Sequence, residues 1–204
     1  MKKVFLAILL ILTSFGVYAQ EEAKPPTAAP TVKDGPQKEY YDTKEVYNEG
    51  NYAKGKREGL FKYYYKTGEL MIERNFKNDR RNGLDRGYSK DGQIVGDITY
   101  KDDRKDGLAR YFYPNSKVKT EVFYKADKLE GPMKQFDPEG SLIYELTYKN
   151  NQLNGVAKQY SKDGKVLAEY SYKNGKRHGV FKEYNDNGSV RAQGEYKEGI
   201  LVKK

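Results

Sequence analysis

The chain has 204 residues, of which 37% are hydrophobic and 33% are charged, and it carries a formal net charge of +9. Its 20 Tyr and 8 Phe residues argue against an intrinsically disordered chain, which would lack such aromatics, and predict a thin fold with much surface per residue. The absence of cysteine excludes disulfides, thiolate catalysis, cysteine-ligated zinc fingers and a lipid-anchoring cysteine.

Residues 1–19 have the layout of a secretory signal peptide. Lys2 and Lys3 give a basic start, residues 4–12 form an uninterrupted apolar run, and a Val-Tyr-Ala stretch ending at Ala19 offers a cleavage position. The apolar run is too short to favour a stable membrane span, so we expect cleavage after Ala19 and export to the periplasm, the cell surface or the medium. An uncleaved anchor is the alternative, and no later stretch could cross a membrane.

Residues 20–32 (QEEAKPPTAAPTV) are rich in Pro, Ala and charge and show no periodic apolar pattern. This composition predicts an extended, flexible linker.

A period of 24 residues organises the chain from Lys33 to its end. Counting from a recurring glycine as position zero, position five is always aromatic, position eleven aliphatic and position seventeen aromatic. Position three is always basic, and position fourteen is acidic except at Gln193. We therefore expect about seven repeats over residues 33–204, the first one degenerate because Lys44 replaces a glycine at position nine. The position-zero glycines are Gly35, Gly59, Gly83, Gly107, Gly131, Gly155 and Gly179.

Each repeat contains two short runs rich in Tyr, Val and Ile around a turn such as Lys162-Asp163-Gly164. Asp or Asn before Gly between such runs is a strong hairpin signal. The predicted fold class is all-β: an elongated single-layer antiparallel meander of tandem 24-residue β-hairpin repeats, with about fourteen strands. The C-terminal residues 199–204 are expected to fold across the last hairpin. The turn at residues 114–116 lacks the glycine and should be the most strained.

Two hairpin registers are possible. A three-residue loop with a left-handed Gly puts position five opposite position eleven, so that positions one, five, eleven, thirteen, fifteen and seventeen share an apolar face. A two-residue loop would pair basic position three with acidic position fourteen, and a one-residue slip flips every side chain, so we treat the two as alternatives. We favour the first, because burying an apolar side chain is worth roughly 1.5–3 kcal/mol and an exposed ion pair about 0.2–1 kcal/mol.

The repeat unit resembles the MORN repeat variant, the shorter and Trp-poor relative of the MORN repeat. The resemblance rests on stretches such as GVAKQYSKDGKVLAEYSYKNGKRHG (residues 155–179) and GLFKYYYKTG (residues 59–68), and it covers about residues 33–199, nearly the whole chain after the signal peptide. It implies an array of β-hairpins that binds proteins or surfaces without catalytic residues. Such bacterial proteins are grouped as toxin–antitoxin antitoxins, and an exported member would act against an exported toxin or in the cell envelope.

Catalysis is not predicted. His178 is the only histidine, so it has neither a cysteine partner nor a second histidine for a metal site, and the other repeats place Asp, Glu or Asn at its position. The acidic column offers similar environments in every repeat, whereas a catalytic pair of carboxylates needs two unlike ones. We expect no enzyme activity, no metal and no cofactor.

The aromatic columns are the candidate binding site. Their structural role is to form the core of a thin sheet, but one side of such a sheet stays open to a partner. We expect a protein partner, with a glycan or an anionic lipid surface as the alternative. Nucleic acid is not expected because of export, and acidic residues alternate with the basic ones, which predicts mixed charge and not a basic patch. The candidate residues are Tyr64, Tyr88, Phe112, Phe136, Tyr160, Tyr184, Tyr100, Tyr124, Tyr148 and Tyr172.

Overall fold

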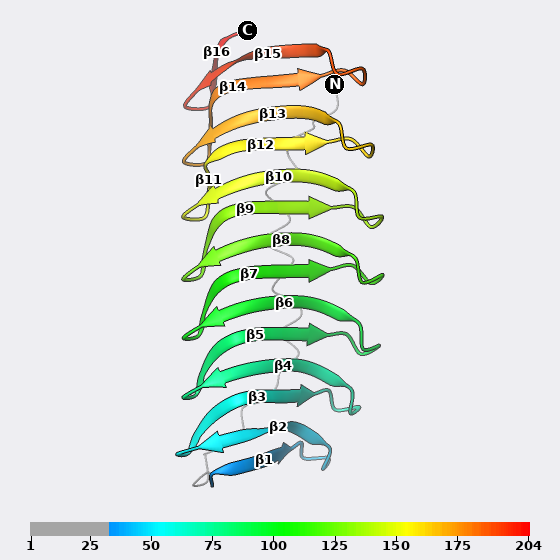
Figure 1. Cartoon of the computed structure of the whole chain (residues 1–204), viewed down its shortest axis with the longest axis vertical. Helices are drawn as coiled ribbons and strands as arrows, with labels where there is room; N and C mark the ends of the chain where they lie inside the picture. Colours follow the sequence, from blue (N-terminus) through cyan, green and yellow to red (C-terminus); the bar gives the residue numbers. More distant parts are fainter. Residues whose placement is uncertain (1–32) are drawn as a thin grey trace. The chain divides into compact units, whose positions relative to one another are not determined.

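The computed structural model describes residues 33–204, and the predicted signal peptide (1–19) and linker (20–32) lie outside the described residues. Residues 33–204 form one open antiparallel sheet of sixteen strands and contain no helix, which confirms the predicted all-β class (Figure 1). The strands are β1 (Gly35–Tyr40), β2 (Val46–Ala53), β3 (Lys56–Tyr64), β4 (Leu70–Lys77), β5 (Arg80–Tyr88), β6 (Ile94–Lys101), β7 (Arg104–Phe112), β8 (Val118–Lys125), β9 (Lys128–Phe136), β10 (Leu142–Lys149), β11 (Gln152–Leu153), β12 (Gly155–Tyr160), β13 (Val166–Lys173), β14 (Lys176–Tyr184), β15 (Val190–Lys197) and β16 (Ile200–Lys203).

Apart from the short β11, which pairs only with β10, the strands are hydrogen-bonded to one another in chain order, with β12 following β10, so the sheet is a continuous meander. The count exceeds the expected fourteen for two reasons. The strand that begins the sixth repeat is interrupted at Asn154, which separates β11 from β12. The C-terminal segment adds β16, which pairs with β15 along the last hairpin, with Tyr196 opposite Leu201.

The loops within the repeats have the predicted three-residue form. The Ser161 N–H donates to the Lys165 carbonyl at 2.8 Å, and the Gly164 N–H donates to the Ser161 carbonyl at 3.0 Å. Gly164 has a φ of 77°, the left-handed conformation that closes this type of hairpin loop.

Both predicted registers occur in the same hairpin, so treating them as alternatives was wrong. Tyr160 lies opposite Val166, as position five and position eleven should. A register shift follows at once, and Lys158 then lies opposite Glu169, as position three and position fourteen would in the other register. The shift is a β-bulge, in which one extra residue on the second strand moves the pairing from one register to the other. The same β-bulge recurs in every hairpin from β1–β2 to β14–β15.

The bulge changes which side chains share a face. Positions two, four, thirteen, fifteen and seventeen point to one side, which we call the packed face, because cross-strand neighbours share a face and alternate residues of a strand do too. The buried residues concentrate there, with Phe61 1%, Ala109 0% and Val122 2% exposed. Positions one and five lie on the opposite side, which we call the open face. The predicted grouping of positions one, five and seventeen on one face was therefore wrong.

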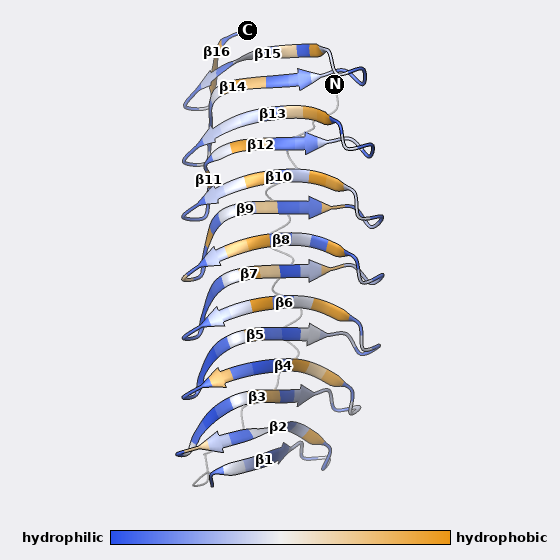
Figure 2. Ribbon diagram, viewed as in Figure 1, coloured by the Kyte–Doolittle hydropathy of each residue, from blue (hydrophilic) through white to orange (hydrophobic). Residues whose placement is uncertain are grey.

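The hydropathy of the ribbon follows this layout. Orange segments lie inside strands such as β10 and β13, whereas the turns at both ends of the strands are blue (Figure 2). The packed face also contains an ion pair, with the Arg74 Nε 2.6 Å from an Asp85 carboxylate oxygen. Burial raises the pKa of the Asp85 carboxyl, and the neighbouring Arg74 charge opposes that change only in part.

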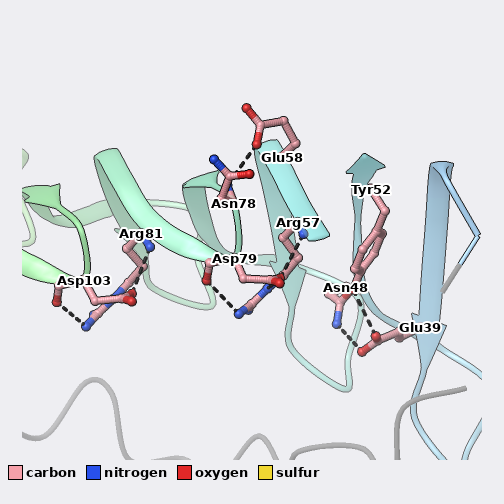
Figure 3. Close-up of polar contacts among 9 residues, drawn as sticks. All are labelled: Glu39, Asn48, Tyr52, Arg57, Glu58, Asn78, Asp79, Arg81 and Asp103. Atoms are coloured by element: carbon pink, nitrogen blue, oxygen red, sulfur yellow. Dashed lines mark hydrogen bonds and ion pairs between the residues drawn. The ribbon is translucent and has the colours of Figure 1, made fainter. Parts of the chain in front are cut away.

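Hydrogen bonds between consecutive turns join each repeat to the next. The Asp79 N–H donates to the Arg57 carbonyl at 3.0 Å, and the Arg57 N–H donates to the Asp79 carboxylate at 2.9 Å. Arg81 and Asp103 repeat these contacts one unit later (Figure 3). The Arg57 guanidinium also lies 4.0 Å from the centre of the Phe76 ring, so the same side chain covers one end of the packed face.

The glycine at position zero is required where the strand bends. Gly107 has a φ of 123°, and a Cβ at this residue would lie 3.1 Å from the Thr99 Cβ of the preceding strand. The Thr99 hydroxyl donates to the Leu108 carbonyl at 3.0 Å across the same bend. The 24-residue glycine period thus marks a bend that each repeat makes at the same place.

Ser116 tests the cost of a non-glycine residue in the hairpin loop. Its φ is 62°, whereas the glycines at the equivalent place have φ values such as 94° at Gly140 and 77° at Gly164. We expect Ser116→Gly to raise the free energy of unfolding by about 0.5–1 kcal/mol, the relief of left-handed strain less the added entropy of the unfolded chain. Urea unfolding measures it. Gly164→Ser is the matched reverse change and should destabilise, and a neutral result for both would contradict the argument.

Candidate functional site

The predicted binding residues divide between the two faces. Those at position five lie on the open face and are half-buried, as for Tyr64 and Tyr160. Those at position seventeen lie on the packed face, where Tyr100 is 8% and Tyr148 7% exposed. The residues of the position-five row, which we call the aromatic row, are Tyr64, Tyr88, Phe112, Phe136, Tyr160 and Tyr184, and those of position seventeen are Tyr100, Tyr124, Tyr148 and Tyr172.

The hydroxyl groups of the aromatic row are held by acids of the preceding repeat. Tyr64 donates to Glu49 at 2.6 Å, and Tyr160 donates to Glu145 at 3.0 Å. Burial, helped by the adjacent carboxylate, raises the pKa of Tyr64 and that of Tyr160 to about 12. The four tyrosine rings of the row are therefore held in orientation, and together with Phe112 and Phe136 they present a neutral aromatic surface at neutral pH.

A ladder of charges crosses the open face beside the aromatic row. Position three of each strand lies opposite position fourteen of both neighbouring strands, as Glu145 does between Lys134 and Lys158. The Arg86 Nε lies 2.8 Å from Asp97, and the Lys158 Nζ lies 3.4 Å from Glu169. Alternating signs make this row close to neutral overall.

The aliphatic row at position one was not predicted as a site. It is apolar in all seven repeats yet lies on the open face, where Leu60 is 45%, Leu84 39% and Val180 54% exposed. Single exposed leucines are ordinary, whereas a row in phase with every repeat is not. The sequence does show that position one is apolar in every repeat, but the predicted register places this position in the core. The row consists of Pro36, Leu60, Leu84, Leu108, Pro132, Val156 and Val180.

The open face is hollowed at its N-terminal end. A cavity of about 490 Å³ lies between the aliphatic row and the charge ladder of the first hairpins. Pro36 and Leu60 supply its apolar walls, and Lys38, Glu49 and Lys62 supply its charges. Among the residues that the structure describes, Lys62 makes no ion pair, whereas Lys38 is 2.9 Å from Glu49.

The charge of the sheet is mixed, but the turns between hairpins carry the excess of positive charge. Lys77 lies opposite Arg80, and Lys173 lies opposite Lys176, so like charges face each other across the turn. The seven turns and their flanking residues contain sixteen Lys and Arg against eight Asp and Glu. We call this side of the sheet the basic edge, and its residue ranges are 53–58, 77–82, 101–106, 125–130, 149–154, 173–178 and 197–202.

His178 has a structural role in the turn of the next repeat. Its Nδ1 accepts the Glu198 N–H at 3.5 Å, in the same way that the Glu58 carboxylate accepts the Asn78 N–H at 2.9 Å. Within residues 33–204, no group of three or more His, Asp or Glu side chains is arranged to hold a metal ion. The same residues contain no helix that could cross a membrane.

Comparison with protein families agrees with this repeat geometry. The sequence profile of the MORN repeat variant matches residues 33–54, 57–78, 105–126, 129–150, 153–174 and 177–198. The chain belongs to the MORN repeat variant family. The repeat between residues 78 and 105 is not matched, but the β5–β6 pair has the same register as the other MORN repeats, with Tyr88 opposite Ile94 and Arg86 opposite Asp97.

The other comparisons add little to the family assignment. A search of curated proteins found no match. Two solved structures are similar over 47% and 46% of this chain: a mutant of TarM from S. aureus in complex with fondaparinux, alpha-GlcNAc-glycerol and UDP, and a second TarM structure. The identities are 12% and 15%, and the TM-scores are 0.34 and 0.33. This chain spans about a fifth of the length of those structures, covering 19% and 20% of them.

Proposed function

We propose that the protein is an exported, non-enzymatic scaffold whose open face holds another protein. The observation that carries the proposal is the aliphatic row, which places an apolar side chain on the open face in every repeat and leaves it exposed in six of the seven, as at Leu60 and Val156. A row of fixed aromatic rings runs parallel to it across the charge ladder. Membership of a repeat family of binding modules supports a scaffold role.

The antitoxin grouping of related repeat proteins suggests the kind of partner. Together with the signal-peptide pattern of residues 1–19, it favours an exported toxin as the protein that is bound and neutralised. The alternative protein partner is a protein of the cell envelope, bound on the same face.

Photo-crosslinking in the envelope of producing cells tests the scaffold. A crosslinking residue in place of Leu84 lies on the open face, and one in place of Lys162 lies at the tip of a hairpin loop and serves as the control. We expect one protein to be crosslinked in stoichiometric amount from position 84 and not from position 162. Equal crosslinking from both positions, or none from position 84, would refute the scaffold role of the open face.

A second candidate function is supported by the basic edge. Exposed cations placed directly opposite each other cost stability, so their recurrence favours binding to an anionic polysaccharide or lipid surface. Vesicles containing anionic lipid should bind the protein at low salt and release it at high salt. Lys173→Glu with Lys176→Glu should weaken this binding, and Lys162→Glu, a charge reversal at the opposite edge, should have little effect. Salt-independent binding would argue against this candidate.

A further inference from the structure

The spacing of the rows on the open face restricts the conformation of a polymer that could follow them. Equivalent residues of consecutive repeats, such as Tyr64 and Tyr88, are two strands apart, which is about 9.6 Å. An extended strand repeats its side-chain direction about every 6.8 Å and an α-helix makes a turn about every 5.4 Å, so neither stays in phase with the rows. A polyproline II helix makes one turn per three residues in about 9.3 Å, close to the repeat distance.

The chemistry of the open face also fits such a helix. Proline rings pack well on aromatic side chains, and the aromatic row presents one ring per repeat. Phe112 and Phe136 have no hydroxyl, and the hydroxyls of its four tyrosines are already held by acids, as Tyr88 is held by Glu73 at 2.7 Å. A polyproline II helix makes no internal hydrogen bonds, so its carbonyl oxygens need donors. The charge ladder supplies one cation per repeat beside the aromatic row, and Lys62 and Lys182 make no ion pair among the described residues.

We infer that the open face binds a proline-rich segment of a partner protein, in the polyproline II conformation, running across the strands with one turn of the ligand per repeat. The aromatic row contacts the proline rings, the ladder lysines donate to the ligand carbonyls, and the aliphatic row borders the other side of the ligand. The hollow lined by Pro36, Leu60 and Lys62 receives one end of the segment. This inference rests on the proposed scaffold function and specifies the chemistry of its partner.

Binding of fluorescent oligoproline peptides to the full chain tests the inference. Peptides of about six, twelve and eighteen residues reach about two, four and six repeats, so affinity should rise at least about tenfold with each step in length. A Gly-Ser peptide of equal length is the control ligand and should not bind, because it is flexible and has no rings. Affinity that does not depend on length would overturn the one-turn-per-repeat arrangement.

Variants locate the binding on the open face. Tyr88→Ala with Phe136→Ala should weaken oligoproline binding about tenfold or more, because two aromatic contacts are lost. Lys162→Ala, outside the three rows, should leave it unchanged, and circular dichroism verifies that every variant keeps its sheet. If oligoproline does not bind while a protein is still crosslinked at position 84, the inference fails and the scaffold function stands. If neither oligoproline binding nor crosslinking occurs, both fail.

Discussion

Raising the pH from 10 towards about 12 should unfold the sheet in one cooperative transition. The pKa of Tyr47 is raised to about 12, chiefly by burial and also by the nearby Tyr63 and Tyr41 rings. Burial likewise raises the pKa of Tyr63, Tyr100 and Tyr148 from the ordinary value of 10.0. The pKa values of these hydroxyls are therefore higher in the folded sheet than in the unfolded chain. Their contribution to stability is therefore complete below pH 10 and is lost as the pH rises through the folded-state pKa values.

Tyrosine absorbance and far-ultraviolet circular dichroism, recorded together against pH, measure this transition. The ionisation of the buried tyrosines and the loss of β structure should coincide. Tyr148→Phe removes one buried titrating group and should move the transition to higher pH, whereas Tyr40→Phe, at a residue 58% exposed, should not. Full tyrosine ionisation with an intact β spectrum would show that these hydroxyls are not protected by burial.

Phe61→Ala is expected to lower the free energy of unfolding by about 3–5 kcal/mol, the usual range for a buried phenylalanine. Phe61 is 1% exposed, and its ring lies between those of Tyr52 and Phe76, with centroids 5.3 and 5.2 Å away. Its ring also occupies the space beside Gly50, where a Cβ would come within 2.4 Å of it. The residues around the ring belong to two consecutive repeats, so the truncation weakens the stacking of these units as well as one contact.

Urea unfolding of the variant measures the loss, with Phe123→Ala as the matched control. Phe123 is 41% exposed on the open face, so its truncation should cost well under half as much as that of Phe61. Equal losses at the two sites would mean that the packed face is not the core of the sheet.

The hairpin architecture could be predicted from the sequence because its signals are local and repeated. The left-handed glycine of each loop, such as Gly164, sets the loop type and the pairing of Tyr160 with Val166. The β-bulge that follows has no residue signature, because the extra residue differs in each copy, from Met71 to Lys119 and Leu167. Without the bulge, the face assignment of position one is reversed, which is why the aliphatic row was taken for core.

The candidate site was predictable only in part for the same reason. The aromatic columns were visible, but their division between two faces depends on the bulge and on the bend at position zero. The stacking of Arg57 on Phe76 joins side chains of two repeats, and no spacing within one repeat predicts it. The basic edge was overlooked because charges that alternate along the chain become neighbours only when the turns are stacked.

Every unit of the sheet joins its neighbours through the same contacts, such as those that link Arg57 to Asp79 and Arg81 to Asp103. A duplication or loss of 24 residues inside the array would therefore leave matching ends on both sides, and the remaining chain would close up without rearranging. Copy number can change by whole units during evolution at small structural cost. The length of the open face would then be set by gene length and not by redesign.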